Sequence, residues 1–422
     1  MFTEKERQVI GALSPLPAVP ADPTNRYADD SAAAHLGQYI FFDERFSLDG
    51  ETSCATCHDP KKSWTDGQAV PAAFSDQLRH VPSLWNVAYN RWYFWDGRAD
   101  SLWSQALHPL EQADEHGGSR AQYAKLVHDD PDLKQAYERI FGTLPEMSDA
   151  SRFPAAAKPL ATQPADPLNV AWGAMSEADR ETVNGVFVNV GKALAAYQRR
   201  IISRASPFDT FVEGLKTRDE RKQRAISDSA KRGLKFFIGR GNCILCHHGP
   251  NFTDNEFHNT GVAELLPLQR PDHGRFLGVH QVLNSPFNVL GSYSDDVEAG
   301  RRSPTAYLVN FVHTKRQFKT PSLRNVARTP PYMHRGQFET LEDVIKFYST
   351  LENPQPKQTV PGLPQRPIPP AHRHGGGDGE HILLPLHLSK TETDDLVAFL
   401  ESLTDESLDT TLMVQPDSPI SR

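Results

Sequence analysis

Apolar residues recur at spacings of three and four in several separate stretches of the chain, and polar residues fill the positions between them. This spacing is typical of helices that pack one face inward. Ser176, Thr340 and Ser389 each precede such a stretch and are followed three positions later by an acidic residue, as at a capped helix N-terminus. The pattern predicts helices over residues 32–42, 101–111, 176–197, 227–237, 340–348 and 389–403.

Three stretches lack this regularity. Residues 150–170 scatter four prolines among alanines, which favours a domain boundary there and domains of 1–165 and 166–422. Residues 262–316 have no clear period and are too long for an ordinary loop, which suggests a specialised surface. Residues 352–382 are rich in Pro, Gly and His, and the His- and Gly-rich part, 372–381, could bind a metal, although a flexible insertion explains it better.

The four cysteines of the chain all lie in two copies of Cys-x-x-Cys-His, at 54–58 and 243–247. This sequence is the attachment signature of c-type haem, in which two thiols form thioethers and the histidine binds iron. Paired Cys-x-x-Cys units also hold zinc or form disulfides. A zinc ribbon needs no histidine after both pairs, and its two pairs lie much closer together. We therefore interpret the motifs as two haem sites, with Cys54, Cys57, Cys243 and Cys246 attaching the haems and His58 and His247 binding their irons.

A length of 422 residues suits two or three domains, and the formal net charge of −8 argues against a nucleic-acid partner. A basic or neutral redox partner fits that charge better. The sequence has no apolar run of about 18 residues, and its first residues are charged, so we expect neither a membrane span nor a leader. Bacterial c-type haem is attached outside the cytoplasm. We therefore expect a mature periplasmic protein.

Two residues have competing interpretations. Glu115 follows the helix predicted over 101–111, where carboxylates usually belong to a solvated helix end. Tyr348 lies on the apolar face of the helix that begins after Thr340, together with Leu341, Val344 and Ile345. From the pattern alone, a core tyrosine with a satisfied hydroxyl is the better interpretation.

Three further motifs carry a resemblance to a known family. They are the stretches 94–98 (Phe-Trp-Asp-Gly-Arg), 318–326 (Phe-Lys-Thr-Pro-Ser-Leu-Arg-Asn-Val) and 331–336 (Pro-Tyr-Met-His-Arg-Gly). With the haem motifs, they make the chain resemble the bacterial dihaem cytochrome c peroxidase and MauG superfamily over nearly its whole length. The resemblance implies a mainly α fold of two cytochrome-c-like haem domains, with long irregular loops, little β structure and a calcium ion between the domains.

The resemblance also implies roles for single residues. His58 is similar to the proximal ligand of the peroxide-reactive haem in the first domain, and Glu115 to the distal acid beside it. Gln105 and Pro109 match other residues of that pocket, and Trp95 matches the tryptophan between the haems. No histidine in 69–78 corresponds to the distal histidine of many resting peroxidases.

Tyr348 aligns with the second axial ligand of the second haem, which is methionine in ordinary cytochrome c peroxidases and tyrosine in MauG. This match reverses the interpretation from the pattern alone. Within the tyrosine-ligated relatives, residues 284–296 look most like the MbnH-type branch, whose enzymes oxidise a tryptophan of a partner protein. Thr329 and Pro331 match family positions that offer backbone carbonyls to calcium, but His80 stands where the family has asparagine.

Together these points predict an enzyme that uses hydrogen peroxide to reach a high-valent state shared by both haems and then oxidises a Trp or Tyr side chain of a partner protein. The alternative is a cytochrome c peroxidase that reduces hydrogen peroxide with electrons from a small cytochrome or cupredoxin. A plain dihaem electron carrier is a third possibility, but a carrier has no need of an acid such as Glu115 beside an open iron site.

Overall fold

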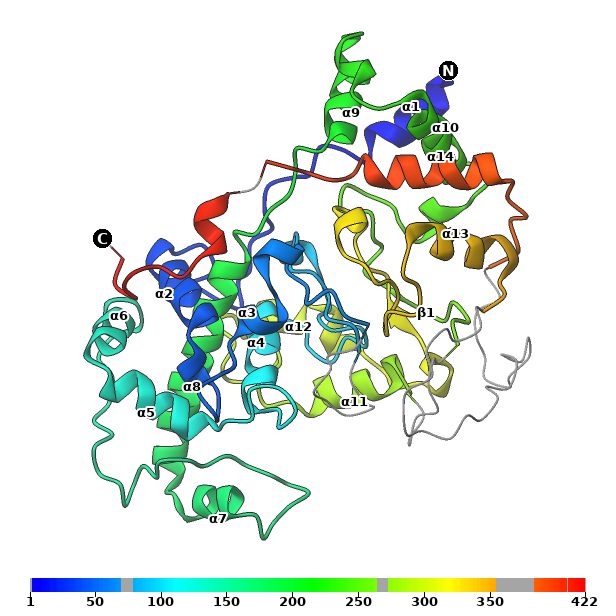
Figure 1. Cartoon of the computed structure of the whole chain (residues 1–422). Coiled ribbons are helices and arrows are strands. Elements are labelled where there is room, and N and C mark those ends of the chain that lie inside the picture. The colour runs from blue at the N-terminus through cyan, green and yellow to red at the C-terminus, as the bar shows by residue number, and fades with distance from the viewer. Residues whose placement is uncertain (1, 70–78, 264–271, 354–382, 408, 422) are drawn as a thin grey trace.

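The computed structural model describes residues 2–69, 79–263, 272–353, 383–407 and 409–421. Within these ranges the chain is mainly helical (Figure 1). The named strands found there are β1 (Phe257–His258) and β2 (Phe318–Lys319), which pair antiparallel with Phe257 opposite Lys319. The expectation of a mainly α fold with little β structure is confirmed.

The helices predicted from the hydrophobic pattern are all present. Ser176 Oγ accepts the backbone N–H of Asp179, and Ser389 forms a reciprocal capping box with Glu392, so the acidic residue three positions after the cap marked these helix starts correctly. The observed elements are α2 (Ser31–Phe42), α4 (Leu102–Glu111), α8 (Glu177–Gln198), α10 (Asp228–Ile238), α13 (Leu341–Thr350) and α14 (Lys390–Glu401).

A first hydrophobic core is built around α2, α4 and α8, with α5 (Arg120–Asp129) and α6 (Pro131–Phe141) beside them. Helices α2 and α8 cross so closely that a Cβ atom on Gly37 would lie 1.9 Å from the carbonyl oxygen of Ala193. Only glycine fits at this crossing. Phe41 and Tyr197 pack edge to face in the same core, with ring centroids 5.1 Å apart.

A second core joins α10, α13 and α14 with α1 (Glu4–Gly11) and α9 (Pro207–Thr217). Here α10 and α14 cross at Gly233, where an added Cβ would lie 1.9 Å from the carbonyl oxygen of Asp395. The two halves are therefore built alike. In each, the helix that precedes the Cys-x-x-Cys-His motif crosses a later helix at a glycine.

The domain division at residue 165 stays a prediction, and the two hydrophobic cores divide the chain at a later point. Helix α8 belongs to the first core, and the chain passes to the second core near residue 202. The two ends of the chain pack against opposite cores. Helix α1, near the N-terminus, packs in the second core. Near the C-terminus, carbonyls of residues 411–414 accept hydrogen bonds from Tyr197 and Gln38, on helices of the first core. Figure 1 shows the N-terminus beside α9 and α10 and the C-terminus near α2 and α6. Proline density at 150–170 marks a surface excursion that includes α7 (Pro167–Ala174), not the division between the cores.

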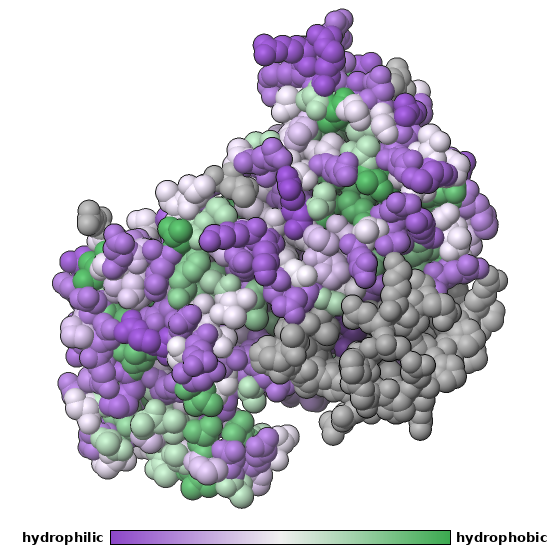
Figure 2. All heavy atoms as spheres, in the orientation of Figure 1, coloured by the Kyte–Doolittle hydropathy of each residue, from purple (hydrophilic) through white to green (hydrophobic). Residues whose placement is uncertain are grey.

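The stretch 262–316 is more regular than its sequence suggested, because it contains α11 (Arg275–Asn284) and α12 (Val297–Arg301). The His- and Gly-rich part, 372–381, lies outside the described residues. Among the helices that are described, we find none long and apolar enough to cross a bilayer. The face shown in Figure 2 is mainly hydrophilic, with a group of apolar residues at its lower left around α7, where Val170 is exposed.

A buried ion pair anchors the second half of the molecule. Arg324 makes two hydrogen bonds to Asp209, of 2.8 and 2.9 Å, and its side chain is fully buried. Asp209 also accepts from Ser206 at the start of α9 and from Ser14. The guanidinium of Arg324 donates further to the carbonyl of Pro250, just after the second haem motif. The pair therefore ties α9 to the loop that follows His247.

We expect Asp209→Ala to destabilise the haem-loaded protein by about 3–5 kcal/mol, because Arg324 would be left buried and unpaired. Chemical denaturation measures this loss. The control is Glu298→Ala, which removes an exposed partner of Arg301 and should cost at most about 1 kcal/mol. Equal losses in both variants would contradict the role given to Asp209.

Candidate active site

The first haem motif begins a short helix, α3 (Cys54–Cys57), capped by Ser53 and Thr56. His58 follows it directly, and its Nδ1 lies 3.0 Å from the carbonyl oxygen of Trp64. A carbonyl can only accept, so Nδ1 carries the proton and Nε2 is left as the atom that can bind a metal. Burial lowers the pKa of His58, which keeps the ring neutral as a metal ligand must be.

The second motif repeats this geometry. His247 Nδ1 lies 3.0 Å from the carbonyl oxygen of Phe252, and burial lowers the pKa of His247 as well. Trp64 and Phe252 both have left-handed backbone conformations, with φ of 63° and 52°. A short turn after each motif thus folds a carbonyl back onto the histidine that precedes it. The same tautomer is imposed on both histidines by local structure alone.

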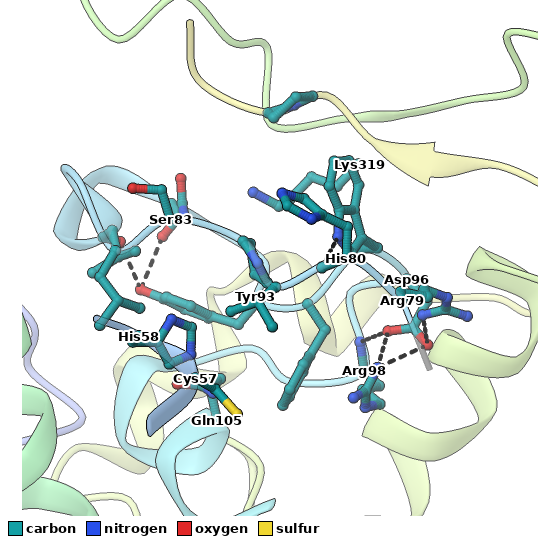
Figure 3. A pocket seen from close by; sticks show the side chains of 18 of the residues that line it. Cys57, His58, Arg79, His80, Ser83, Tyr93, Asp96, Arg98, Gln105 and Lys319 are labelled. Carbon is teal, nitrogen blue, oxygen red and sulfur yellow. Dashed lines mark hydrogen bonds and ion pairs between the residues drawn. The ribbon is translucent and has the colours of Figure 1, made fainter. Parts of the chain in front are cut away.

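A cavity of about 430 Å³ runs from the first motif toward the second half of the molecule. Figure 3 shows Cys57, His58 and Gln105 on one side of this cavity and Lys319 with His80 on the other. The structure therefore brings most of the predicted pocket together around one space. The predicted residues that line it are Cys57, His58, His80, Trp95, Gln105, Pro109, Glu115, Thr329 and Pro331.

Glu115 is placed by the turn that ends α4, where its backbone N–H donates to the carbonyl of Gln112 at 3.0 Å. Pro109 and Gln105 lie on α4 itself, so the three pocket residues share one rigid support. Burial raises the pKa of Glu115, and the positive charge of Arg98 opposes this rise only in part. Glu115 is thus a partly buried carboxyl that keeps its proton to a higher pH than a carboxyl in water does, rather than part of a solvated helix end.

Trp95 lies between the two halves. Its indole Nε1 donates to the carbonyl of His80 at 2.8 Å, and its own carbonyl accepts the N–H of Lys319 at 2.7 Å. One hydrogen bond therefore holds the indole and a second holds the backbone of Trp95. This placement fits the tryptophan position between the haems that the family resemblance implies.

A buried ion network that sequence reasoning missed supports the Trp95 loop. Asp96 pairs with Arg79 at 2.7 Å and with Arg98 at 3.1 Å (Figure 3). Arg79 also pairs with Asp272. Although burial opposes ionisation, the two arginines hold the pKa of Asp96 at about 2. Asp272 is far from Asp96 in sequence, and of the four partners only Asp96 and Arg98 lie in a motif that the sequence analysis singled out, at 94–98.

Lys319 is a second residue without a predicted role. It lies on β2 and lines the cavity, and burial lowers its pKa to about 8. A lysine between aromatic and small residues in the 318–326 motif was the available signal. Lys319 is the cationic residue that β2 contributes to the cavity wall.

Tyr348 does not line this cavity but lies beside the second motif. Burial raises its pKa, and the neighbouring Cys243 and Cys246 add to the rise. Its ring packs on Phe347, in a cluster with Tyr332 and Met333. Helix α13 therefore brings the tyrosine to the second Cys-x-x-Cys-His site, as an axial ligand must be, although its packing alone is equally that of a core tyrosine. Its assignment as an iron ligand stays a prediction.

The predicted calcium residues lie on one side of the cavity, but their donor set is incomplete. His80 uses Nδ1 for the carbonyl of Gln68, at 2.8 Å, and its own carbonyl accepts from Trp95. Thr329 and Pro331 contribute carbonyl oxygens only. Among the residues that the structure describes, the sole cluster of three potential metal-binding side chains is Cys246, Asp254 and His258, which lies elsewhere. Calcium prefers six or more oxygen ligands, so these residues do not form a site by themselves.

The residues around both motifs fit covalently attached haem. All four cysteines are free thiols with partial exposure, so each is available for a thioether. Each motif histidine offers Nε2, as described above. Trp85 lines the cavity, and its Nε1 is buried without a hydrogen-bond acceptor in the described structure. A haem carries propionate groups that can accept such a bond.

Two helical halves, each with a Cys-x-x-Cys-His motif and a preset histidine, define a dihaem c-type protein. A family model described as di-haem cytochrome c peroxidase matches residues 31–217. Cytochrome-c peroxidase IdrP1 of Denitromonas iodatirespirans is 30% identical over 400 residues, which cover 93% of this chain and 86% of that protein. The methylamine utilization protein MauG of Paracoccus denitrificans is 30% identical over an alignment of 441 positions, which covers 94% of this chain and 95% of that protein.

Solved structures show the same fold. The diheme peroxidase BthA of Burkholderia thailandensis superposes with a TM-score of 0.63 at 23% identity, covering 95% of this chain and 92% of that one. A MauG-like protein associated with microbial copper homeostasis gives 0.61 at 24% identity, covering 95% and 97%. The chain belongs to the dihaem cytochrome c peroxidase and MauG family, and it is a peroxidase-type oxidoreductase.

Proposed function

We propose that this enzyme uses hydrogen peroxide to oxidise an aromatic side chain, Trp or Tyr, of a partner protein. The observation that carries the proposal is the position of Tyr348 beside Cys243 and Cys246. A phenolate ligand favours oxidised iron, whereas a thioether raises the potential and suits an electron-accepting haem. The named MauG relatives support the same conclusion, since MauG is the family member with tyrosine at this position.

When bound, the two haems supply the redox chemistry with peroxide. The chain supplies the rest. His58 and His247 present Nε2 because their Nδ1 protons are held by Trp64 and Phe252. The carboxyl of Glu115 faces the cavity, where it can accept a proton from one oxygen of peroxide and return it to the other as the O–O bond breaks. Gln105 and Pro109 shape the wall beside that carboxyl.

Trp95 connects the halves. Its indole donates to the carbonyl of His80, and its backbone carbonyl accepts from Lys319, so the side chain can lose and regain an electron with little rearrangement. We assign it the role of relay between the haem sites. Tyr348 would hold the iron of the second haem through its phenol oxygen, and this ligand would favour the oxidised form of that haem.

The second candidate is a cytochrome c peroxidase that takes electrons from a small cytochrome or cupredoxin. The relatives named cytochrome-c peroxidase favour it, because they match nearly the whole chain. Both functions share Glu115, Trp95 and peroxide. They differ in the source of the electrons, which is an aromatic side chain in the first function and the metal centre of a small redox protein in the second. They differ also in the second axial ligand, which we assign to Tyr348.

We further propose a periplasmic location, because c-type haem is attached there in bacteria. Calcium remains part of the proposal in a restricted form: Thr329 and Pro331 would give carbonyl oxygens, and further oxygen ligands would have to complete the site. Metal analysis of the purified protein tests this.

The ligation pattern predicts two unlike irons. Tyr348 is available to the second site, and the first has no comparable side chain assigned opposite His58. Electron paramagnetic resonance of the oxidised protein should show one high-spin and one low-spin ferric signal. Two low-spin signals would remove the open iron position that peroxide needs.

A further inference from the structure

An exposed apolar segment follows α12. Tyr307, Val309, Phe311 and Val312 are 76%, 57%, 50% and 63% exposed. They fall within six residues, whereas the other exposed large apolar residues of the described chain are mostly scattered singly. Scattered apolar residues need no explanation, but a cluster of this kind marks an interaction surface. Leu277 and Leu283 on the neighbouring helix α11 are exposed as well.

Basic residues flank this segment on both sides. Arg301 and Arg302 precede it, and Lys315 and Arg316 follow it, with Glu298 the one acidic residue between positions 297 and 316. All four basic side chains are exposed. The chain as a whole carries a formal net charge of −8, so this region has the opposite sign to the rest. We call residues 301–316 the basic apolar surface.

The basic apolar surface is joined directly to helix α11 and the Trp95 loop. Arg316 N–H donates to the carbonyl of His273 at 3.1 Å, and Arg275 N–H donates to that of Gln317 at 2.9 Å. The guanidinium of Arg275 then donates to the carbonyl of Gly97 at 2.8 Å. At Gly278, an added Cβ would lie 2.0 Å from the carbonyl oxygen of Asp96. Helix α11 therefore packs its backbone against the residues that follow Trp95.

Helix α11 also reaches the cavity. His273, Leu277 and Gln281 line it, and Leu277 is 42% exposed at the same time. Figure 1 shows α11 in the lower part of the molecule. A protein resting on the basic apolar surface would thus lie one helix away from Trp95.

We propose that the basic apolar surface docks the partner protein, and that the partner presents an acidic face with an apolar centre. This deepens the proposed function and rests on it, since it names the charge of the macromolecule that exchanges electrons through Trp95. The net charge of the chain favours a basic or neutral partner. On the basic apolar surface, the local charge favours the reverse. Complementary charge steers encounter, and exposed aromatic and arginine side chains supply most contact energy.

The test measures binding of two small c-type cytochromes of similar size, one acidic and one basic, to the haem-loaded enzyme without peroxide. Titrations at about 10 mM and about 150 mM ionic strength separate steering from apolar contact. The variants are Arg302→Glu with Lys315→Glu, and Phe311→Ser. The control is Arg200→Glu with Arg221→Glu, two exposed arginines elsewhere, which changes the net charge equally.

We expect the parent to bind the acidic cytochrome more tightly than the basic one. Charge reversal at the basic apolar surface and Phe311→Ser should each weaken binding by about tenfold or more, and the control should not. Preference for the basic cytochrome, or equal losses in the control, overturns the proposal. Concentration-dependent dimers that Phe311→Ser abolishes also overturn it, because a second copy of the chain would then cover the surface. Because no peroxide is present, failure of binding here is distinct from failure of the proposed chemistry.

Discussion

Tyr348→Met should convert the enzyme from one that reacts with peroxide when fully oxidised to one that needs an electron first. Methionine places a thioether where the phenol lies beside Cys243 and Cys246. Axial-ligand identity spans about 0.8 V of haem potential, so we expect the second haem to rise on the order of 0.1 V or more. Potentiometry and the optical spectrum report the change directly. The variant should then resemble an electron-accepting peroxidase.

The matched control is Tyr332→Phe. Tyr332 packs in the same cluster as Tyr348 and is half-buried, but it lies on the cavity wall rather than beside the thiols. Loss of its hydroxyl should leave both potentials unchanged. If Tyr348→Met also leaves the potentials and the spectrum unchanged, Tyr348 is a core residue and the proposed ligation is wrong.

Glu115→Gln should slow the reaction with peroxide by about 10²- to 10⁴-fold, the range usual for loss of a general acid–base group. The amide keeps the shape of the side chain but cannot exchange a proton. Both haems and the fold should be retained, because Glu115 makes no ion pair within 4 Å in the described structure. Stopped-flow mixing with peroxide measures the rate. Asp114→Asn is the control, since Asp114 lies next to Glu115 and lines the same cavity.

The pH profile gives a second test of Glu115. Burial raises its pKa, so its proton remains bound to a higher pH than that of an ordinary carboxyl group. Because the carboxylate must accept a proton before returning it, the peroxide rate should rise as the pH rises through this raised pKa and level off above it. Glu115→Gln should remove this rise, whereas Asp114→Asn should keep it. An unchanged profile in Glu115→Gln would exclude the residue as the proton carrier.

The sequence predicted the parts of the fold that depend on local signals. The capping residues Ser176 and Ser389 predicted where α8 and α14 begin. The Cys-x-x-Cys-His motifs predicted the two candidate iron-binding histidines. Helix α11 was missed because its first residue follows Gly274, which has no side chain to cap it. The apolar residues of α11 also lie on both its buried and its exposed sides, since Val279 and Val282 are buried whereas Leu277 and Leu283 are exposed. No single helical face could be seen in the pattern.

The division between the cores could not be predicted either. It depends on α8 packing against α2 across more than a hundred residues and on the termini crossing to opposite cores. Long-range contacts of this kind leave no local spacing in the sequence. The same is true of Arg79, Asp96 and Asp272, whose pairing was invisible until the Trp95 loop was placed. For the site, the family motifs supplied what periodicity could not: Trp95, Gln105, Pro109 and Glu115 do line one cavity.

The most direct test of the account mixes the fully ferric protein with a single equivalent of hydrogen peroxide and then adds the protein encoded by the neighbouring gene. The partner is weighed and sequenced by mass spectrometry. The account predicts reaction without prior reduction, followed by a gain of whole oxygen atoms or a loss of hydrogens on a Trp or Tyr of the partner. An enzyme that stays inert until it is reduced, and then oxidises many equivalents of a small cytochrome with no partner modified, would contradict it.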